Sequence, residues 1–262
     1  MRPLSARNPR VQRLARLARR REERTRERAL VVEGPTAIGG AIDAGVVVQE
    51  IYVEAGSADR PPVAAVLARL AAVDGAPDPW EVPAGVLERI AGAAQGVVAV
   101  VEEPVPDWPT PDRCRFVLVL VDVADPGNVG TLVRAAVASG VGAVIVVGGA
   151  DPMGPKVLRT AAGTAFLLPV LTSTDAVAAL ARLHADGYRT VAAVVDPTAE
   201  AHDSIALDGP VAVVVGNEAH GLDPQVVDAA DARTTIAMAG PAESLNVAMA
   251  GTLLCFEVLR RG

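Results

Sequence analysis

The sequence predicts an α/β protein in two parts: a small N-terminal α/β module and a larger C-terminal domain built on a parallel sheet. Beyond residue 115, β-branched runs of four to six residues alternate with helical segments, as in a doubly wound sheet whose strands are buried on both faces. A proline-rich stretch separates this pattern from the N-terminal residues. A chain of 262 residues also suits two domains of roughly 150 residues or fewer.

In the N-terminal module, residues 8–28 predict one amphipathic basic helix, because apolar and basic side chains recur at helical spacing on different faces. The apolar face carries Val11, Leu14, Leu17 and Ala18, and the basic face carries Arg13, Arg16 and Arg20. Strands are predicted over 29–33, 46–53 and 97–101, and helices over 35–44, 63–73 and 83–91. Residues 1–103 are therefore expected to form one domain.

The segment 104–114 is predicted to be a linker, since its four prolines favour neither a helix nor a central strand. The C-terminal domain, 115–262, follows it. Its expected strands cover 116–121, 143–147, 166–171, 190–195, 211–215 and 234–237, with helices between them.

Charge is distributed unevenly along the chain. Residues 1–28 hold eleven arginines and three glutamates, a formal charge of +8, whereas the whole chain carries −7. A basic segment on an acidic body suggests contact with a polyanion such as RNA. We therefore expect RNA contacts from Arg10, Arg13, Arg16 and Arg20. A solvated helix is the alternative, because 23 of the 24 basic residues in the chain are arginines.

Several protein classes are disfavoured by composition. Apolar runs stay well below the roughly 18 residues of a membrane-spanning helix, and residues 1–10 do not resemble a secretory signal. Cys114 and Cys255 lie 141 positions apart, without the spacing of a metal site. We expect a soluble cytoplasmic protein with neither a membrane segment nor a bound metal.

Three strand exits concentrate glycine and polar residues: 122–130, 216–222 and 238–246. Ligands of parallel α/β sheets bind at the carboxyl ends of the strands, so these loops are the candidate site. Each loop alone could be a turn or a helix cap, and His220 is more typical of a loop residue than of a base. The GxxxxGK[ST] phosphate loop is absent, and Gly140 to Ala143 lacks the dinucleotide fingerprint.

Together, the three loops resemble the motifs of the SpoU/TrmH family of RNA ribose 2′-O-methyltransferases. Asn128 and Arg134 within DPGNVGTLVR match the first motif, GNEAHGL matches the second, and Ser244 to Val247 within MAGPAESLNVAMAGTLLCFE match the third. The resemblance extends over residues 115–260. More weakly, RNPRVQRLARL and the following VVEG resemble the family's RNA-binding extension.

The resemblance implies a SPOUT domain with a trefoil knot, a homodimer formed through that domain, and S-adenosyl-L-methionine as the cofactor. The residues that would contact the cofactor are Gly216, Ile236 and Leu245. Arg134 would act on the ribose 2′-hydroxyl in the partner's pocket, and Glu218 would pair with Arg134 or take part in proton removal. Asn128, Ser244 and Asn246 would hold groups by hydrogen bonds.

The sequence departs from the family pattern at Ala161, where many relatives carry a serine after the lysine matched by Lys156. Large-subunit ribosomal RNA is the expected substrate. Transfer RNA, or self-protection against a ribosome-targeting antibiotic, stays open. Two other classes are disfavoured. A non-catalytic RNA-binding or ribosome-assembly protein would not need all five polar residues of the motifs, and a nucleotide-dependent oxidoreductase would need the glycine fingerprint that is missing. The five residues are Asn128, Arg134, Glu218, Ser244 and Asn246.

Overall fold

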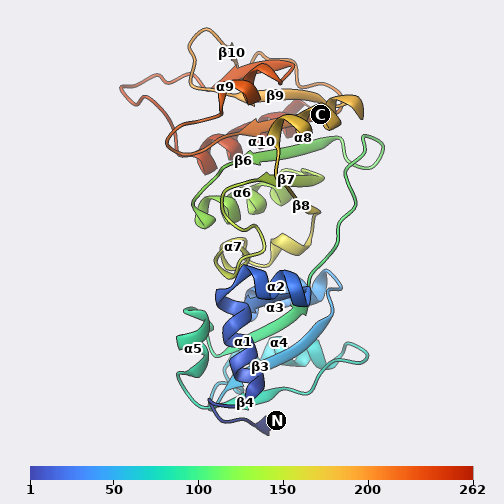
Figure 1. Cartoon of the computed structure of the whole chain (residues 1–262), viewed down its shortest axis with the longest axis vertical. Coiled ribbons are helices and arrows are strands. Elements are labelled where there is room, and N and C mark those ends of the chain that lie inside the picture. The colour runs from blue at the N-terminus through green and yellow to red at the C-terminus, as the bar shows by residue number, and fades with distance from the viewer. Residues whose placement is uncertain (262) are drawn as a thin grey trace. The chain divides into compact units, whose positions relative to one another are not determined.

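The computed structural model describes residues 1–261, which form two compact units (Figure 1). Unit 1 combines Met1–Val105 with Met153–Leu167, and unit 2 combines Pro106–Pro152 with the chain from Leu168 onward. The expected boundaries therefore differ from the contact units in two places. The residues 106–114 of the expected linker have their contacts in unit 2, and Met153–Leu167, expected in the C-terminal domain, have theirs in unit 1.

Unit 1 contains a mixed five-stranded sheet in the order β1-β4-β3-β5-β2. The strands are β1 (Arg2–Pro3), β2 (Ala29–Glu33), β3 (Val48–Glu54), β4 (Trp80–Val82) and β5 (Val97–Glu102). β5 runs antiparallel to β2 and β3, while β3, β4 and β1 are parallel. The sequence reading missed β1 and β4, because two or three residues are too few to show a strand period.

The helices of unit 1 are α1 (Pro9–Arg19), α2 (Arg21–Glu27), α3 (Pro35–Asp43), α4 (Pro61–Ala71), α5 (Val86–Ala91) and α7 (Pro155–Thr160). The prediction of one helix over 8–28 is wrong, because Arg20 is extended and separates α1 from α2. The apolar stripe of α1 ends near Leu17, whose carbonyl accepts a 2.8 Å hydrogen bond from the buried Arg24 guanidinium. This contact satisfies an end carbonyl of α1 and turns the chain.

A second finding in unit 1 explains why α7 belongs there. The Arg159 guanidinium of α7 is ion-paired with Glu33 at the end of β2, and only 3% of the Glu33 side chain is exposed. A Cβ on Gly40 of α3 would lie 2.2 Å from the carbonyl oxygen of Gly163, so the two glycine backbones are in direct contact. Glycine at both positions permits this close approach.

Unit 2 contains a seven-stranded, wholly parallel sheet in the order β10-β12-β9-β11-β6-β7-β8. The strands are β6 (Phe116–Val121), β7 (Ala143–Val147), β8 (Val170–Ser173), β9 (Arg189–Ala193), β10 (Glu200–Ala201), β11 (Val211–Val215) and β12 (Ala232–Thr235). The parallel sheet and the ranges of β6, β7 and β11 are confirmed. The strand predicted over 166–171 is displaced: Thr164–Phe166 form a 3₁₀ turn after Gly163, whose φ is +84°.

The remaining helices are α6 (Pro126–Ala138), α8 (Ala176–Ala185), α9 (Pro224–Asp228) and α10 (Val247–Arg261). α10 packs closely on α6, since a Cβ on Gly251 would lie 2.4 Å from Leu132 Cδ2. The start of unit 2 is held by Trp108, whose Nε1 donates to Asp186 at 2.9 Å. The Arg182 guanidinium lies 4.0 Å from the centre of the Trp108 ring. Within residues 1–261, no helix is long and apolar enough to cross a membrane.

Candidate functional site

The loop after β6 leads directly into α6 and carries the first motif. Asp125 is the N-cap of α6, and its side chain accepts a hydrogen bond from the Gly127 amide. Pro126 begins the helix at the position where a missing N–H is harmless. Asn128 therefore lies in the first turn of α6, at the carboxyl end of the central strand β6.

The loop after β11 supplies a carboxylate to this turn. Glu218 accepts hydrogen bonds from the Ala124 and Asp125 amides, both at 3.0 Å, and from Asn128 Nδ2 at 2.8 Å. Asn217 adds a 2.9 Å hydrogen bond from its Nδ2 to the carbonyl of Asp122. The first and second motifs thus form one hydrogen-bonded unit.

The third motif joins the same network. Asn246 Nδ2 donates to Asn128 Oδ1 at 3.2 Å, and Asn246 Oδ1 accepts from the Ala248 amide at 2.9 Å. Asn246 therefore caps α10 while contacting the start of α6. Asn128 is the link between Glu218 and Asn246, and three loops distant in sequence converge on it.

These contacts determine the charge state of Glu218. Partial burial by itself raises its pKa, but the hydrogen bonds from Ala124, Asn128 and Asp125 outweigh that effect and lower the pKa to about 2. Glu218 is consequently a stable anion at neutral pH and a poor proton acceptor. Its carboxylate holds the loop, and no ion pair joins it to Arg134 within the described chain.

Arg134 lies on α6, six residues after Asn128, and is exposed. Among residues 1–261 its guanidinium has neither a hydrogen bond nor an ion pair. Ser244 is also exposed, on the loop before α10, and its hydroxyl is not hydrogen-bonded to any described residue. Both side chains are available to a bound molecule.

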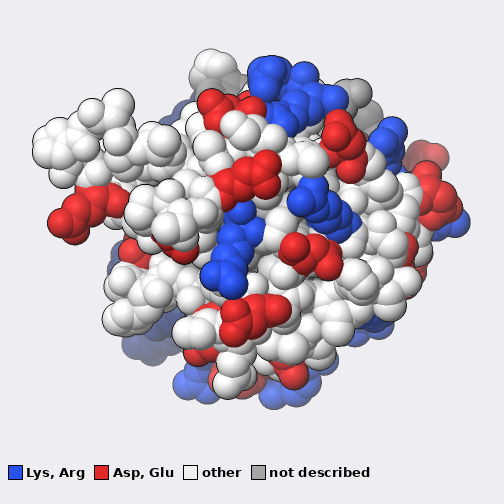
Figure 2. All heavy atoms as spheres, turned by 90° about the horizontal axis from the view of Figure 1, so that it is seen from above, with Lys and Arg blue, Asp and Glu red and all other residues white. Residues whose placement is uncertain are grey.

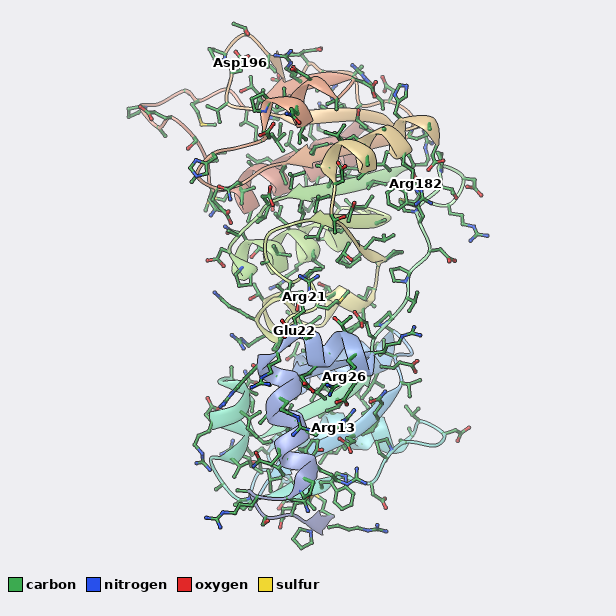
Figure 3. All side chains as sticks on the ribbon, viewed as in Figure 1. Arg13, Arg21, Glu22, Arg26, Arg182 and Asp196 are labelled. Carbon is green, nitrogen blue, oxygen red and sulfur yellow. The ribbon has the colours of Figure 1, made fainter. Side chains whose placement is uncertain are left out.

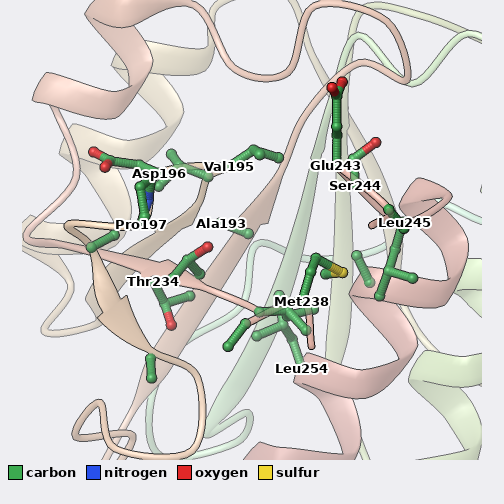
Figure 4. A pocket seen from close by; sticks show the side chains of 18 residues that line it. Ala193, Val195, Asp196, Pro197, Thr234, Met238, Glu243, Ser244, Leu245 and Leu254 are labelled. Atoms are coloured by element: carbon green, nitrogen blue, oxygen red, sulfur yellow. The ribbon is translucent and has the colours of Figure 1, made fainter. Parts of the chain in front are cut away.

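A pocket with a volume of about 480 Å³ opens beside this network, at the exits of β9 and β12 (Figure 4). Residues 193–197 and 234–238 line it, as do 242–245, Ala199, Ala201, and Ala250 and Leu254 of α10. Its base is apolar, formed in part by Met238 and Leu254. Figure 4 shows the Glu243 carboxylate pointing away from that base.

Two of the three expected cofactor residues, Ile236 and Leu245, line this pocket, and Gly216 does not. A Cβ on Gly216 would lie 2.4 Å from the carbonyl carbon of Gly221 and 2.6 Å from the Leu222 amide nitrogen. Gly216 thus permits the loop after β11 to fold back on itself. From the sequence, we expect Gly216 to let a ligand approach the backbone. The atoms next to Gly216 belong instead to Gly221 and Leu222 of its own loop.

The β9 exit is the part of the pocket that the sequence reading missed. Asp196 and Pro197 there look like any turn, and Asp196 Oδ1 accepts hydrogen bonds from the backbone and side chain of Thr198. No motif distinguishes the segment. Its one signal was position, since it follows a parallel strand.

Within residues 1–261, no three or more His, Cys, Asp or Glu side chains are grouped so that they could hold a metal ion.

Comparison with known proteins identifies the family. The SpoU rRNA Methylase family model matches residues 115–256, and an MRM3-like substrate binding domain matches residues 8–99. The chain belongs to the SpoU rRNA methylase family. Its three hydrogen-bonded motifs all lie within the matched range.

Individual relatives agree with this assignment. The chain is 34% identical to the Bacillus subtilis 23S rRNA (guanosine(2553)-2'-O)-methyltransferase RlmP over 55% of its own length, and it covers 58% of that protein. A solved RNA 2'-O ribose methyltransferase has a TM-score of 0.83 and 32% identity, with 99% of this chain and 98% of that chain covered. The SpoU methyltransferase AviRb from Streptomyces viridochromogenes, solved with AdoMet, has a TM-score of 0.81 and 28% identity, with 97% and 98% covered.

Proposed function

We propose that this SpoU family member transfers the methyl group of S-adenosyl-L-methionine to a ribose 2′-hydroxyl of ribosomal RNA in the cytoplasm. The observation that carries the proposal is the convergence of Glu218, Asn128 and Asn246 beside an apolar pocket and an unpaired Arg134. A non-catalytic RNA-binding protein would need the basic surface but not this arrangement.

The pocket fits the cofactor in size and chemistry. Its volume of about 480 Å³ lies within the usual range of small-molecule sites. Ile236, Leu245 and Leu254 offer apolar cover for an adenine ring, and the backbone of the β12 exit offers polar groups at the rim. When bound, the cofactor supplies an already activated methyl group, so the protein's task is to position and polarise the hydroxyl.

Arg134 suits that task as a cation. A guanidinium with a pKa above about 12 is a poor base, but beside the 2′-oxygen it stabilises the alkoxide that develops as the hydroxyl proton passes to solvent water. Glu218, ionised and fully engaged, keeps the first turn of α6 in place and thereby positions Asn128. Ser244 is free to hydrogen-bond the ribose or its phosphate.

A second copy of the chain would complete the site. Met249, Leu253, Phe256 and Leu259 form an exposed stripe on α10, with 62%, 46%, 44% and 52% of each residue accessible. Four large apolar side chains at helical spacing are typical of a covered face. α10 packs on α6, the helix that carries Arg134. We propose a homodimer through this stripe, with Arg134 of one copy acting at the partner's pocket.

Unit 1 would bind the RNA. It contains the residues matched by the substrate-binding family model, and ribosomal RNA is named for the Bacillus relative. Over most of the face in Figure 2, basic and acidic side chains are interspersed, and a group of basic side chains lies at its upper edge. In unit 1, the eleven arginines of residues 1–28 are the candidates for phosphate contacts.

The direct test is methyl transfer. The protein is incubated with cofactor labelled in its methyl group and with unmodified ribosomal RNA, transfer RNA or protein. Label in ribosomal RNA, followed by a reverse-transcription stop at one nucleotide, supports the proposal. Label in transfer RNA alone would show that transfer RNA is the substrate. Binding of RNA without methyl transfer would favour a non-catalytic RNA-binding protein.

A further inference from the structure

The arginines of residues 1–28 are not equally available to RNA. Arg13 contacts Glu27 at 2.6 Å and Glu50 at 2.9 Å, and Arg10 is also paired with Glu50. Arg26 lies 2.5 Å from Glu23, and Arg16 approaches the same carboxylate at 3.8 Å. Figure 3 shows Arg13 on α1 and Arg26 on α2.

The pairs centred on Glu50 belong to the framework of unit 1. Only 10% of the Glu50 side chain is exposed, and it accepts a 2.7 Å hydrogen bond from the hydroxyl of the buried Tyr52. An arginine that turned from Glu50 to a phosphate would remove one of the two cations that pair with this buried carboxylate. It therefore has little capacity to replace counterions on RNA.

A different set of arginines makes no ion pair within residues 1–261: Arg7, Arg19, Arg20, Arg21 and Arg28. Three of them are consecutive at the junction of α1 and α2. Arg89 of α5 lies next to these arginines, because Arg19 Nη2 donates a hydrogen bond to the backbone carbonyl of Arg89 at 3.3 Å. Arg89 is exposed and makes no ion pair with any described residue.

We propose that Arg19, Arg20, Arg21 and Arg89 form the phosphate-binding cluster of unit 1, and that Arg10 and Arg13, which share Glu50, are structural. This inference rests on the proposed function, because it locates the RNA on the unit assigned to bind it. Arg89 lies seventy residues from Arg19 and outside the basic segment. The nearest carboxylates in sequence, Glu22 and Glu88, leave the cluster net positive.

The test measures ribosomal RNA binding as a function of salt. The variant Arg19→Gln with Arg89→Gln removes two unpaired cations. Each lost contact should reduce the slope of log K against log salt by about 0.7 to 0.9, and affinity at 0.1 M salt by about fivefold. Arg26→Gln is the matched control: it removes an exposed arginine of the same segment that is paired, and its slope should stay close to the wild-type value.

The outcomes separate the two proposals. Wild-type methylation and binding, with an unchanged slope in the double variant, would overturn the cluster and leave the function intact. An equal loss of slope in Arg26→Gln would overturn the distinction between paired and unpaired arginines. Failure of the wild-type protein to bind or methylate RNA would overturn the proposed function, and the cluster with it. Cofactor affinity and thermal midpoint should not change in the Arg19/Arg89 variant.

Discussion

Asn128 Nδ2 lies 2.8 Å from Glu218 Oε1, a contact that joins loops ninety residues apart in sequence. Because the same carboxylate also accepts from the Ala124 and Asp125 amides, it fixes the entire entry into α6. Arg134 projects from that helix almost two turns later. The position of Arg134, the proposed catalytic cation, thus depends on the Glu218 carboxylate, which is ionised at neutral pH.

Glu218→Gln should weaken this arrangement. An amide retains one acceptor oxygen but places a donor where a backbone N–H now points, so the N–H of Ala124 or of Asp125 loses its acceptor. We expect the free energy of unfolding to fall by about 1 to 2 kcal/mol and methyl transfer to fall at least tenfold. Denaturant unfolding and single-turnover transfer measure the two effects. Full activity in a folded variant would contradict the anchoring role.

The same pair makes a pH prediction. The pKa of Glu218 is lowered from its ordinary 4.5 to about 2, so its ionised form stabilises the fold fully above about pH 4.5, and this contribution is lost as the pH falls toward 2. The difference in unfolding free energy between wild type and Glu218→Gln should therefore shrink between pH 4.5 and 2. Between pH 5 and 9, the activity profile should contain no titration from Glu218.

Occupying the pocket should abolish cofactor binding. Ala237 lines it and is exposed, so Ala237→Trp adds an indole with little cost to the core. We expect affinity for S-adenosyl-L-methionine, measured by calorimetry, to fall at least a hundredfold. Ala239→Trp is the control, because Ala239 is exposed on the same loop but does not line the pocket. Equal affinities for the two variants would place the cofactor elsewhere.

The ion pair between Glu33 and Arg159 should show non-additive stability effects. Burial raises the pKa of Glu33, although Arg159 opposes the shift, so the carboxylate depends on its partner. Arg159→Gln should destabilise the protein by about 1 to 3 kcal/mol, discounted because Arg159 is partly exposed. Glu33→Gln in the same chain should recover most of that loss. Additive losses in a double-mutant cycle would show that the two residues act independently.

How far the sequence predicts this structure depends on where its signal lies. Runs such as 116–121 and 211–215 are apolar on both faces, and only a central parallel strand buries them, so their bounds are correct. The helix break at Arg20 had no such signal. It arises from the Arg24 contact with Leu17, a tertiary hydrogen bond that periodicity does not contain.

The site shows the same division. The strand-exit rule and the three motifs together identify Asn128, Glu218 and Asn246, which the structure brings into one network. The separate roles of these residues could not be predicted from the sequence, because only the hydrogen-bond partners of a carboxylate distinguish an anchoring residue from a base. Similarly, which arginines near the N-terminus are free depends on Glu50, a residue on another strand that no local pattern connects to α1.

The proposed sharing of an active site between two copies of the chain yields the most demanding prediction. Arg134→Ala should abolish methyl transfer while leaving cofactor affinity nearly unchanged, because the cation acts at the ribose oxygen and lies outside the pocket lining. Ala237→Trp should be inactive for the opposite reason, since its Arg134 is intact and its pocket is blocked.

A mixed dimer contains one Arg134→Ala chain and one Ala237→Trp chain. One of its two sites would combine the intact Arg134 of the Ala237→Trp chain with the open pocket of the Arg134→Ala chain. Mixing the two inactive proteins under subunit exchange should therefore restore activity, approaching a quarter of the wild-type value per chain when half of the dimers are mixed. If mass spectrometry confirms subunit exchange and methyl transfer stays absent, Arg134 acts at the pocket of its own chain. The proposal that Arg134 acts at the partner's pocket is then wrong.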